Sequence, residues 1–266
     1  MTRVGLIACY AGVLASVATP KLSSALSLRS ATESSQESRD GFALFISIEQ
    51  TAPKADDKTD ECLTIINTMR TGAVKGLLEA LTKAQDNEVT ESLKKLKKEG
   101  EENTTAKTIA AKLAGTDATT CDSAASANAE TYPGLVIPFA YDTKFDCNAL
   151  IEETYTAGLS HLKESRFDPS TGKYDINEVP FNNVAASNVA FLMSSKSTKV
   201  SCAATKDCTG GHNILFCYFV EPLQNGEAPF TTELYNALWE TETGAASISV
   251  PSAATGLLSL ALILLT

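Results

Sequence analysis

The sequence lacks the residues and motifs on which most enzymes and metal proteins depend. It contains only two histidines, His161 and His212, in 266 residues. No glycine-rich phosphate loop, G-x-S-x-G turn or H-E-x-x-H motif occurs, and no two cysteines have the C-x2-C spacing of a zinc site. The sequence therefore predicts no catalytic residue, no metal site and no cofactor.

Positive charge is also scarce. Lys and Arg number 22 against 32 Asp and Glu, which gives a formal net charge of −10. Because an acidic surface repels nucleic acid and anionic lipid headgroups, we expect neither as a partner. Residues 94–98 are rich in lysine, a pattern that suggests heparin binding, but Glu99, Glu101 and Glu102 follow directly. We therefore prefer a solvated helix end for this segment.

No apolar run reaches the roughly 20 residues that a membrane-spanning helix needs. The C-terminal run, residues 257–265, has no basic residue after it, and small residues and a polar spacer precede it. This order is typical of a glycosylphosphatidylinositol (GPI) attachment signal. We predict that residues 244–266 are removed and that the lipid is attached at Gly244, Ala245 or Ala246. The alternative, a buried C-terminal helix, is disfavoured because the run has no polar face.

The N-terminus has the pattern of a secretory signal peptide. Arg3 precedes an apolar stretch over residues 4–18, and small residues follow at 23–25. The predicted divisions are a signal peptide (1–25), a flexible leader (26–41), one domain (42–243) and the attachment signal (244–266). An export signal together with a lipid anchor predicts a protein on the extracellular face of the plasma membrane.

The cysteines predict a disulfide framework. Cys9 lies in the signal peptide, which leaves an even number in the exported chain. In an oxidising compartment an even set is typical of disulfides rather than of metal ligands or nucleophiles. The six are Cys62, Cys121, Cys147, Cys202, Cys208 and Cys217. The residues alone leave their pairing open.

Hydrophobic periodicity predicts an α+β domain with helices on both faces of a small sheet. Predicted helices cover residues 56–84, 104–115, 146–166, 183–193 and 232–239. The apolar pattern of the first helix continues to Leu96. Predicted strands cover residues 132–141, 199–204 and 213–220. The last two strands flank a Gly-Gly turn and predict a hairpin. The apolar run 42–48 could be a strand or a helix.

The two histidines could have functional roles, but each has a simpler explanation. His161 lies on a predicted helix three residues before Glu164, so it could be a general base. We prefer a surface ion pair, because no nucleophile or second ligand is nearby. His212 follows two glycines in a turn, and we expect it to face solvent.

Three further residues could also have functional roles. Tyr235 and Trp239 lie four apart on the last predicted helix and could anchor a partner, although core packing is the more common role of such a pair. Asn103 begins the sequon Asn-Thr-Thr in a polar context, which makes it a candidate for N-glycosylation.

Four segments resemble the GPI-anchored surface antigens of coccidian parasites of the Eimeria type. They are PFAYDTKFDCNALIEETY (138–155), PFNNVAASNVAFLMSSKSTKVSCAATKDC (180–208), GGHNILFCYFVEPL (210–223) and PSAATGLLSLALILLT (251–266). The resemblance implies an antigen of the invasive stage that attaches to a host-cell surface component and is seen by host immunity. It also implies a disulfide-braced three-layer αβα sandwich related to the CAP superfamily (cysteine-rich secretory proteins, antigen 5 and PR-1), with a small antiparallel sheet flanked by helices.

The CAP comparison carries two more implications. By analogy, Cys202 pairs with Cys217 across the hairpin, and Cys208 pairs with an earlier cysteine. CAP proteins often carry paired histidines that can bind zinc. The segments that look like their histidine motifs are residues 187–190 and 66–70, and neither contains histidine. The resemblance therefore implies that the metal-binding histidines are missing.

Our leading hypothesis is a non-enzymatic, GPI-anchored adhesin and antigen with a monomeric ectodomain and a recognition surface on loops. The alternative is a CAP-like pocket protein that binds a small apolar ligand such as a lipid or sterol. A hydrolase ranks third. A centre filled with side chains favours the adhesin, and an open apolar cleft favours the pocket protein.

Overall fold

The computed structural model describes residues 51–245 apart from 73, 75 and 97–102. The chain divides into the units Met1–Ser47 and Ile48–Thr266, and every described residue belongs to the second. The predicted signal peptide, the leader, the apolar run 42–48 and residues 246–266 of the predicted attachment signal lie outside the described residues.

A central hairpin organises the sheet. Strands β4 (Lys199–Thr205) and β5 (His212–Phe219) pair antiparallel, as the sequence predicted, and their side chains are buried on both faces. β3 (Leu135–Ala140) pairs antiparallel with β5, and β1 (Ala55–Asp57) pairs antiparallel with β4. The short β2 (Thr82–Lys83) runs parallel to β4, so the five-stranded sheet is not wholly antiparallel.

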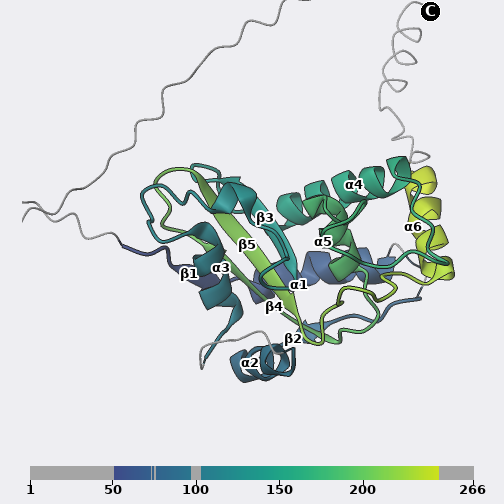
Figure 1. Ribbon diagram of the computed structural model, residues 1–266, viewed down its shortest axis with the longest axis horizontal. Coiled ribbons are helices and arrows are strands. Elements are labelled where there is room, and N and C mark those ends of the chain that lie inside the picture. Colours follow the sequence, from purple (N-terminus) through teal and green to yellow (C-terminus); the bar gives the residue numbers. More distant parts are fainter. Residues whose placement is uncertain (1–50, 73, 75, 97–102, 246–266) are drawn as a thin grey trace, which may run out of the picture. The chain divides into compact units, whose positions relative to one another are not determined.

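Helices cover both faces of this sheet (Figure 1). They are α1 (Thr59–Asn67), α2 (Asp86–Lys95), α3 (Ala106–Ala114), α4 (Cys147–Glu164), α5 (Val184–Leu192) and α6 (Thr232–Ala245). Because strand side chains alternate, Cys202 and Leu215 join a core with α1, α4, α5 and α6. Ala203 and Phe216 point to the other face and join a second core with α2 and α3. The predicted α+β layering is confirmed, while kinship with the CAP superfamily stays a prediction.

The helix predicted over residues 56–84 is wrong in extent. α1 ends at Asn67, a single π-helical turn follows over Thr68–Gly72, and the chain then crosses to β2. The predicted continuation to Leu96 is a separate helix, α2. Leu77, which lies within the range of the predicted helix, is 38% exposed.

Backbone and side-chain contacts explain this early end. Gly76 adopts a left-handed φ of +79°, which a continuing right-handed helix excludes. The Asn67 amide bonds the returning chain in both directions. Its Nδ2 donates to the Leu81 carbonyl at 2.9 Å, and its Oδ1 accepts from the Leu81 N–H at 2.7 Å. These bonds hold Leu81, directly before β2, against the end of α1.

Capping residues set the other helix boundaries. Asp146 accepts hydrogen bonds from two backbone N–H groups in the first turn of α4, as its position predicted. Asn183 caps α5 in the same way. The start of α3, predicted at Thr104, is displaced by one residue. Thr105 is the cap, and α3 ends before Gly115 as expected.

Arg70 is the largest fully buried side chain among the described residues, and it donates three hydrogen bonds to backbone carbonyl groups. Its guanidinium donates to Leu192 and Ser194 at 2.7 and 2.9 Å and to Glu79 at 3.2 Å. Burial lowers the pKa of Arg70 to about 10, so it stays charged at neutral pH. A cation here suits the C-terminus of α5, where helix carbonyls lack partners.

We expect Arg70→Met to lower the free energy of unfolding by about 3 kcal/mol, because it leaves buried carbonyls without donors. Lys94→Met, on the exposed face of α2, is the control and should change it by less than about 0.5 kcal/mol. Equilibrium denaturation under oxidising conditions measures both. Equal stability of the two variants would contradict a bridging role for Arg70.

Candidate functional site

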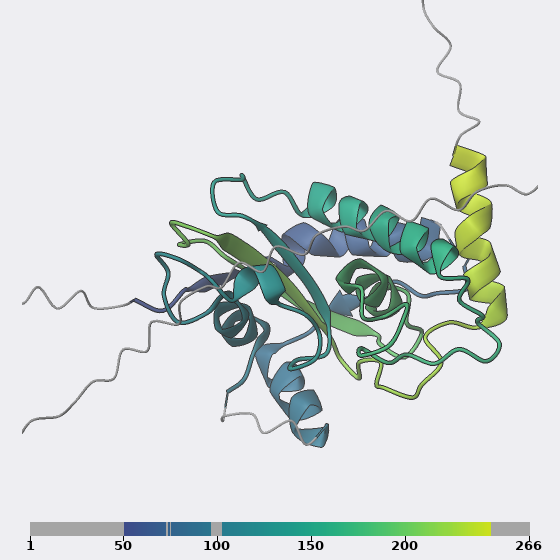
Figure 2. The same ribbon diagram turned by 45° about the horizontal axis from the view of Figure 1, so that its top comes forward.

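Three segments distant in sequence meet at the end of the sheet that lies away from α6 (Figures 1 and 2). We call them the tip: residues 51–56, 117–122 and 206–211. The Thr209 N–H donates to the Ala118 carbonyl at 2.8 Å, and the Ala118 N–H donates to the Thr51 carbonyl at 2.8 Å. The Lys54 N–H donates to Asp207 Oδ1 at 2.8 Å. Backbone hydrogen bonds therefore join all three segments.

The two glycines of the hairpin turn are required by this contact. A Cβ on Gly210 would lie 2.5 Å from the Thr119 carbonyl oxygen. A Cβ on Gly211, whose φ is +65°, would lie 2.1 Å from the Thr120 carbonyl oxygen. The sequence predicted the turn but not its close approach to residues 119–121, because linear spacing carries no information on which distant loop packs against a turn.

A disulfide between Cys121 and Cys208 fixes the tip covalently. Both cysteines are buried, and Cys121 adopts a left-handed φ of 40°. Beside them, the Tyr141 N–H donates to the Gly211 carbonyl at 3.3 Å, and the Tyr141 side chain is 47% exposed. The tip is thus a set of rigid polar loops with an exposed aromatic residue next to it. Exposed tyrosines of this kind are enriched among residues that dominate binding at protein interfaces.

The other cysteines pair as Cys62–Cys147 and Cys202–Cys217. The second is the pair that the resemblance favoured, and Cys121 is the earlier cysteine that Cys208 reaches. Since each of the six belongs to a disulfide, none offers a thiolate nucleophile.

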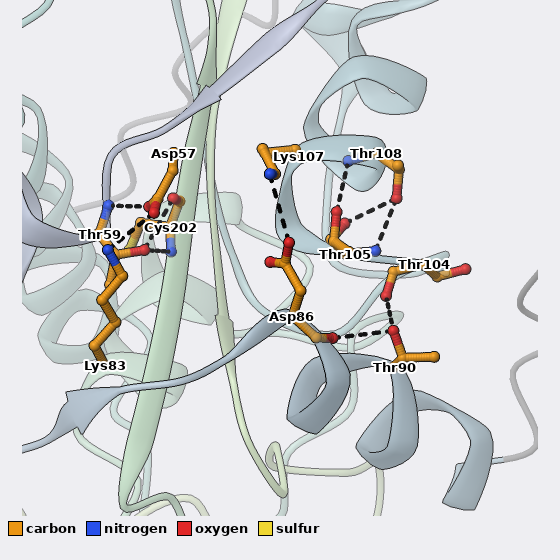
Figure 3. A network of polar contacts seen from close by, with 10 residues as sticks. All are labelled: Asp57, Thr59, Lys83, Asp86, Thr90, Thr104, Thr105, Lys107, Thr108 and Cys202. Carbon is orange, nitrogen blue, oxygen red and sulfur yellow. Dashed lines mark hydrogen bonds and ion pairs between the residues drawn. The ribbon is translucent and has the colours of Figure 1, made fainter. Parts of the chain in front are cut away.

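Thr59 connects α1 to the centre of the sheet (Figure 3). Its hydroxyl donates to the Cys202 carbonyl at 3.2 Å and accepts from the Cys202 N–H at 2.9 Å. Asp57 accepts from the Thr59 N–H and forms an ion pair with Lys83 at 2.9 Å. Partial burial acts to raise the pKa of the Asp57 carboxyl, but these hydrogen bonds outweigh it and hold the pKa below its usual range. These polar side chains hold α1 and β2 to the sheet, because their hydrogen-bond and ion-pair partners are other residues of the domain.

The predicted sequon lies next to a second cluster in the same view (Figure 3). The Thr90 hydroxyl donates to the Thr104 carbonyl at 2.8 Å, and Lys107 pairs with Asp86 at 3.4 Å. Asn103 itself is exposed and has a left-handed φ of 81°. Its side chain is therefore accessible, and glycosylation at Asn103 stays a prediction.

The segment that looks like a CAP histidine motif, residues 187–190, has a structural role here. Asn188 Oδ1 accepts from the Val136 N–H at 2.8 Å, and its Nδ2 donates to the Val136 carbonyl at 2.8 Å. The side chain thus takes the place of a neighbouring strand on the outer edge of β3. Pro138, which lacks an N–H, lies on the same edge. No sequence signal distinguished Asn188 from other helical asparagines.

The histidines and acids do not form a recognisable reaction centre. His161 lies in the last turns of α4 and His212 at the first residue of β5. His212 is half-buried rather than fully solvent-facing, and His161 Nε2 is buried without a hydrogen-bond partner in the structure. Within the described ranges, no cluster of three His, Cys, Asp or Glu side chains could hold a metal ion.

The interior gives no support to the pocket-binding alternative. Large side chains such as Phe181, Phe191 and Phe216 fill the two cores. An apolar pocket beside Tyr174 and Leu223 has a volume of about 200 Å³, below the range of roughly 300–1,000 Å³ typical of ligand sites. A groove of about 450 Å³ beside β3 and α4 is open to solvent. A closed, filled centre is what the adhesin hypothesis predicted.

Tyr235 packs in the core, and Trp239 is half-buried and packs against it. Their rings are 5.4 Å apart, and Tyr235 also contacts Phe167 and Phe230 at centroid distances of 5.8 Å. Lys163 lies over the Trp239 ring at 5.7 Å. This favours the structural explanation for the pair and shows how α6 is attached to the domain.

Comparisons with known proteins identify a matching family model and a similar solved structure. Residues 58–256 match the family model described as the sporozoite surface antigen (SAG) protein domain. The crystal structure of the Eimeria tenella surface antigen protein SAG19 is 61% identical, with a TM-score of 0.69. The match covers 72% of this chain and 99% of that one. No curated protein matches the chain.

We expect Gly211→Ala to destabilise the protein by about 2 kcal/mol more than Gly226→Ala. Both glycines have left-handed φ values, +65° and +86°, so an alanine introduces similar backbone strain at either position. Only at position 211 would the new Cβ meet another backbone, because nothing lies within 4 Å at position 226. Denaturation curves give the difference, and faster proteolysis within residues 117–122 of Gly211→Ala should accompany it. Equal losses would show that the tip contact is dispensable.

Proposed function

This chain belongs to the sporozoite surface antigen family of coccidian parasites, and we propose that it is a GPI-anchored, non-enzymatic protein that attaches to host cells through its tip. The observation that carries the proposal is the tip itself, a rigid set of exposed loops at the opposite end of the domain from α6 (Figure 1). Recognition surfaces are commonly loops positioned by a stable scaffold.

The proposed anchorage is supported by the order of small residues, spacer and apolar run from Gly244 to Thr266. Within the part of the chain that the structure describes, no helix is long and apolar enough to cross a bilayer. The predicted signal peptide over residues 1–25 supplies the matching export signal. Family membership places the protein at the cell surface in general terms, and the lipid is our specific proposal.

The non-enzymatic role is supported by the chemistry of the described residues. The six cysteines are engaged in disulfides, and the buried side chains of Arg70 and Asn188 bond to backbone groups. Asn67 and Asn188, which lie in the segments that resemble CAP histidine motifs, hold backbone segments together instead. A polar group committed to such bonds is not available to a substrate.

Because Tyr141 borders the tip at Gly211, attachment through the tip predicts that Tyr141→Ala lowers binding to host epithelial cells at least tenfold. Truncating an exposed aromatic at the centre of an interface typically costs about 2 kcal/mol. The matched control is Val179→Ala, since Val179 is also exposed, at 66% against 47% for Tyr141. Secreted ectodomain (residues 26–245) would be titrated on intact cells, with unlabelled protein as competitor. Loss of binding in both variants or in neither would overturn attachment through the tip, and absence of saturable binding would overturn attachment itself.

A further inference from the structure

β3 is the strand at one edge of the sheet, so its outer side has no neighbouring strand in the path of the described sheet. The Tyr141 N–H donates to the Gly211 carbonyl on the side of β5. Successive residues of an antiparallel pair turn their N–H and C=O groups alternately toward the partner strand and away from it. Every second residue before Tyr141 therefore bonds to β5. The residues between them, Val136, Pro138 and Ala140, turn their backbone groups outward.

This outer edge is closed to an antiparallel strand. In an antiparallel pair, an opposing residue bonds to the N–H and the C=O of one and the same residue. Asn188 occupies both groups of Val136, and Pro138 has no N–H. The Ala140 C=O already accepts from the Thr143 N–H at 3.0 Å. No residue of β3, all of which the structure describes, offers both groups outward. A two-fold dimer through this edge has no site either, because identical strands related by a two-fold axis pair antiparallel.

The same edge is open to a parallel strand at one position. A residue of a parallel strand donates to the carbonyl of one residue and accepts from the N–H two positions later. The Pro138 carbonyl and the Ala140 N–H have this spacing, and no described residue bonds to either group. The missing N–H of Pro138 is not needed in this arrangement. One residue of a parallel segment, opposite Phe139, can thus make two backbone hydrogen bonds.

The groove of about 450 Å³ beside β3 and α4 lies at this position, and we call it the β3 groove. Its apolar lining residues include Ile137, Phe139, Leu150 and Ala157. Residues 137–140 of β3 all line it, which corresponds to about 13 Å of extended chain. A residue opposite Phe139 has its side chain on the same face of the sheet as Phe139, the face that α4 covers. The groove therefore suits a short extended segment.

The charged residues around the β3 groove are mostly acidic. Glu153 and His212 are the titratable residues that line it, and no described residue pairs with the exposed Glu153 carboxylate. The other charged residues on the loop before α4 and on its first two turns are Asp142, Lys144, Asp146 and Glu152. Lys58, which lies over the Phe145 ring, is paired with Glu61 at 2.6 Å. The excess of carboxylates favours a cationic side chain in the groove.

We propose that the β3 groove binds an extended polypeptide segment of the host-cell surface, parallel to β3, with a Lys or Arg side chain at Glu153. Its backbone bonds to Pro138 and Ala140. The C-terminal direction of the segment leads to the tip, because β3 itself runs toward Tyr141. This inference rests on the proposed attachment to host cells, and it names the partner as a protein with an exposed basic segment. Two backbone bonds give little affinity, so the cationic side chain supplies the specificity.

Peptide selection tests the groove independently of host cells. A phage library of random linear heptapeptides is selected on full-length protein displayed on transfected cells, with untransfected cells for counter-selection. We expect enrichment of one Lys or Arg among apolar and β-branched residues. Glu153→Lys should reverse the preference to Asp or Glu. The matched control is Glu152→Lys, which makes the same change in net charge outside the groove lining and should leave the preference for a cation.

The backbone bonds are tested with an enriched peptide as a synthetic probe. Ala140→Pro removes the outward N–H, and we expect it to weaken binding about fivefold, the effect of one hydrogen bond. Ala140→Val keeps the N–H and is the control. N-methylation of the Lys or Arg in the peptide removes the donor to Pro138 and should have a similar effect. This second measurement does not depend on the folding of a variant.

The outcomes separate the groove from attachment. No enriched peptide, or peptides indifferent to Glu153→Lys, Ala140→Pro and N-methylation, would overturn the proposal. Binding of a glycan on an array that Glu153→Lys removes would overturn it as well, because the occupant is then not a polypeptide. Saturable binding to host cells that the peptides do not compete overturns the role of the groove and leaves attachment through the tip standing. Absence of saturable cell binding, with the peptide results as expected, overturns attachment alone.

Discussion

Three disulfides constrain the chain at the points on which the rest of the structure depends. Cys202–Cys217 joins the two central strands, Cys62–Cys147 joins α1 to the start of α4, and Cys121–Cys208 joins the tip loop to the hairpin turn. The last two close loops with sequence separations of 85 and 87 residues. In the chain-entropy model, closing loops of this size removes about 4 to 5 kcal/mol of unfolded-state entropy each. These two links therefore stabilise the folded domain mainly by restricting the unfolded chain.

Around these links, buried polar side chains connect the layers. Arg70 closes the C-terminus of α5, Asn188 covers the edge of β3, and Thr59 joins α1 to β4. Each forms hydrogen bonds with backbone groups of another element. These interior polar groups are thus used for structure, and recognition through the exposed loops of the tip is our proposal.

Elements with strong local signals were predictable from the sequence. The hairpin followed from two apolar runs around Gly210 and Gly211, and α4 followed from its cap and apolar stripe. The length of the helix predicted over residues 56–84 was overestimated. Its apolar periodicity continues in the sequence, but the hydrogen bond between Asn67 and Leu81 and the left-handed backbone at Gly76 end the helix early. The contacts within the tip and the hydrogen bonds of Asn188 to the outer edge of β3 could not be predicted. Both depend on contacts between residues more than 50 positions apart, such as Asn188 with Val136 and Thr209 with Ala118.

The central claim is that one covalent framework holds the helices and the tip to a single sheet. Peptide mapping of the unreduced, secreted protein by mass spectrometry tests it most directly. The account predicts three linked peptide pairs, joining Cys62 to Cys147, Cys121 to Cys208 and Cys202 to Cys217. A link between Cys121 and any cysteine other than Cys208, or free thiols at these positions, would contradict it.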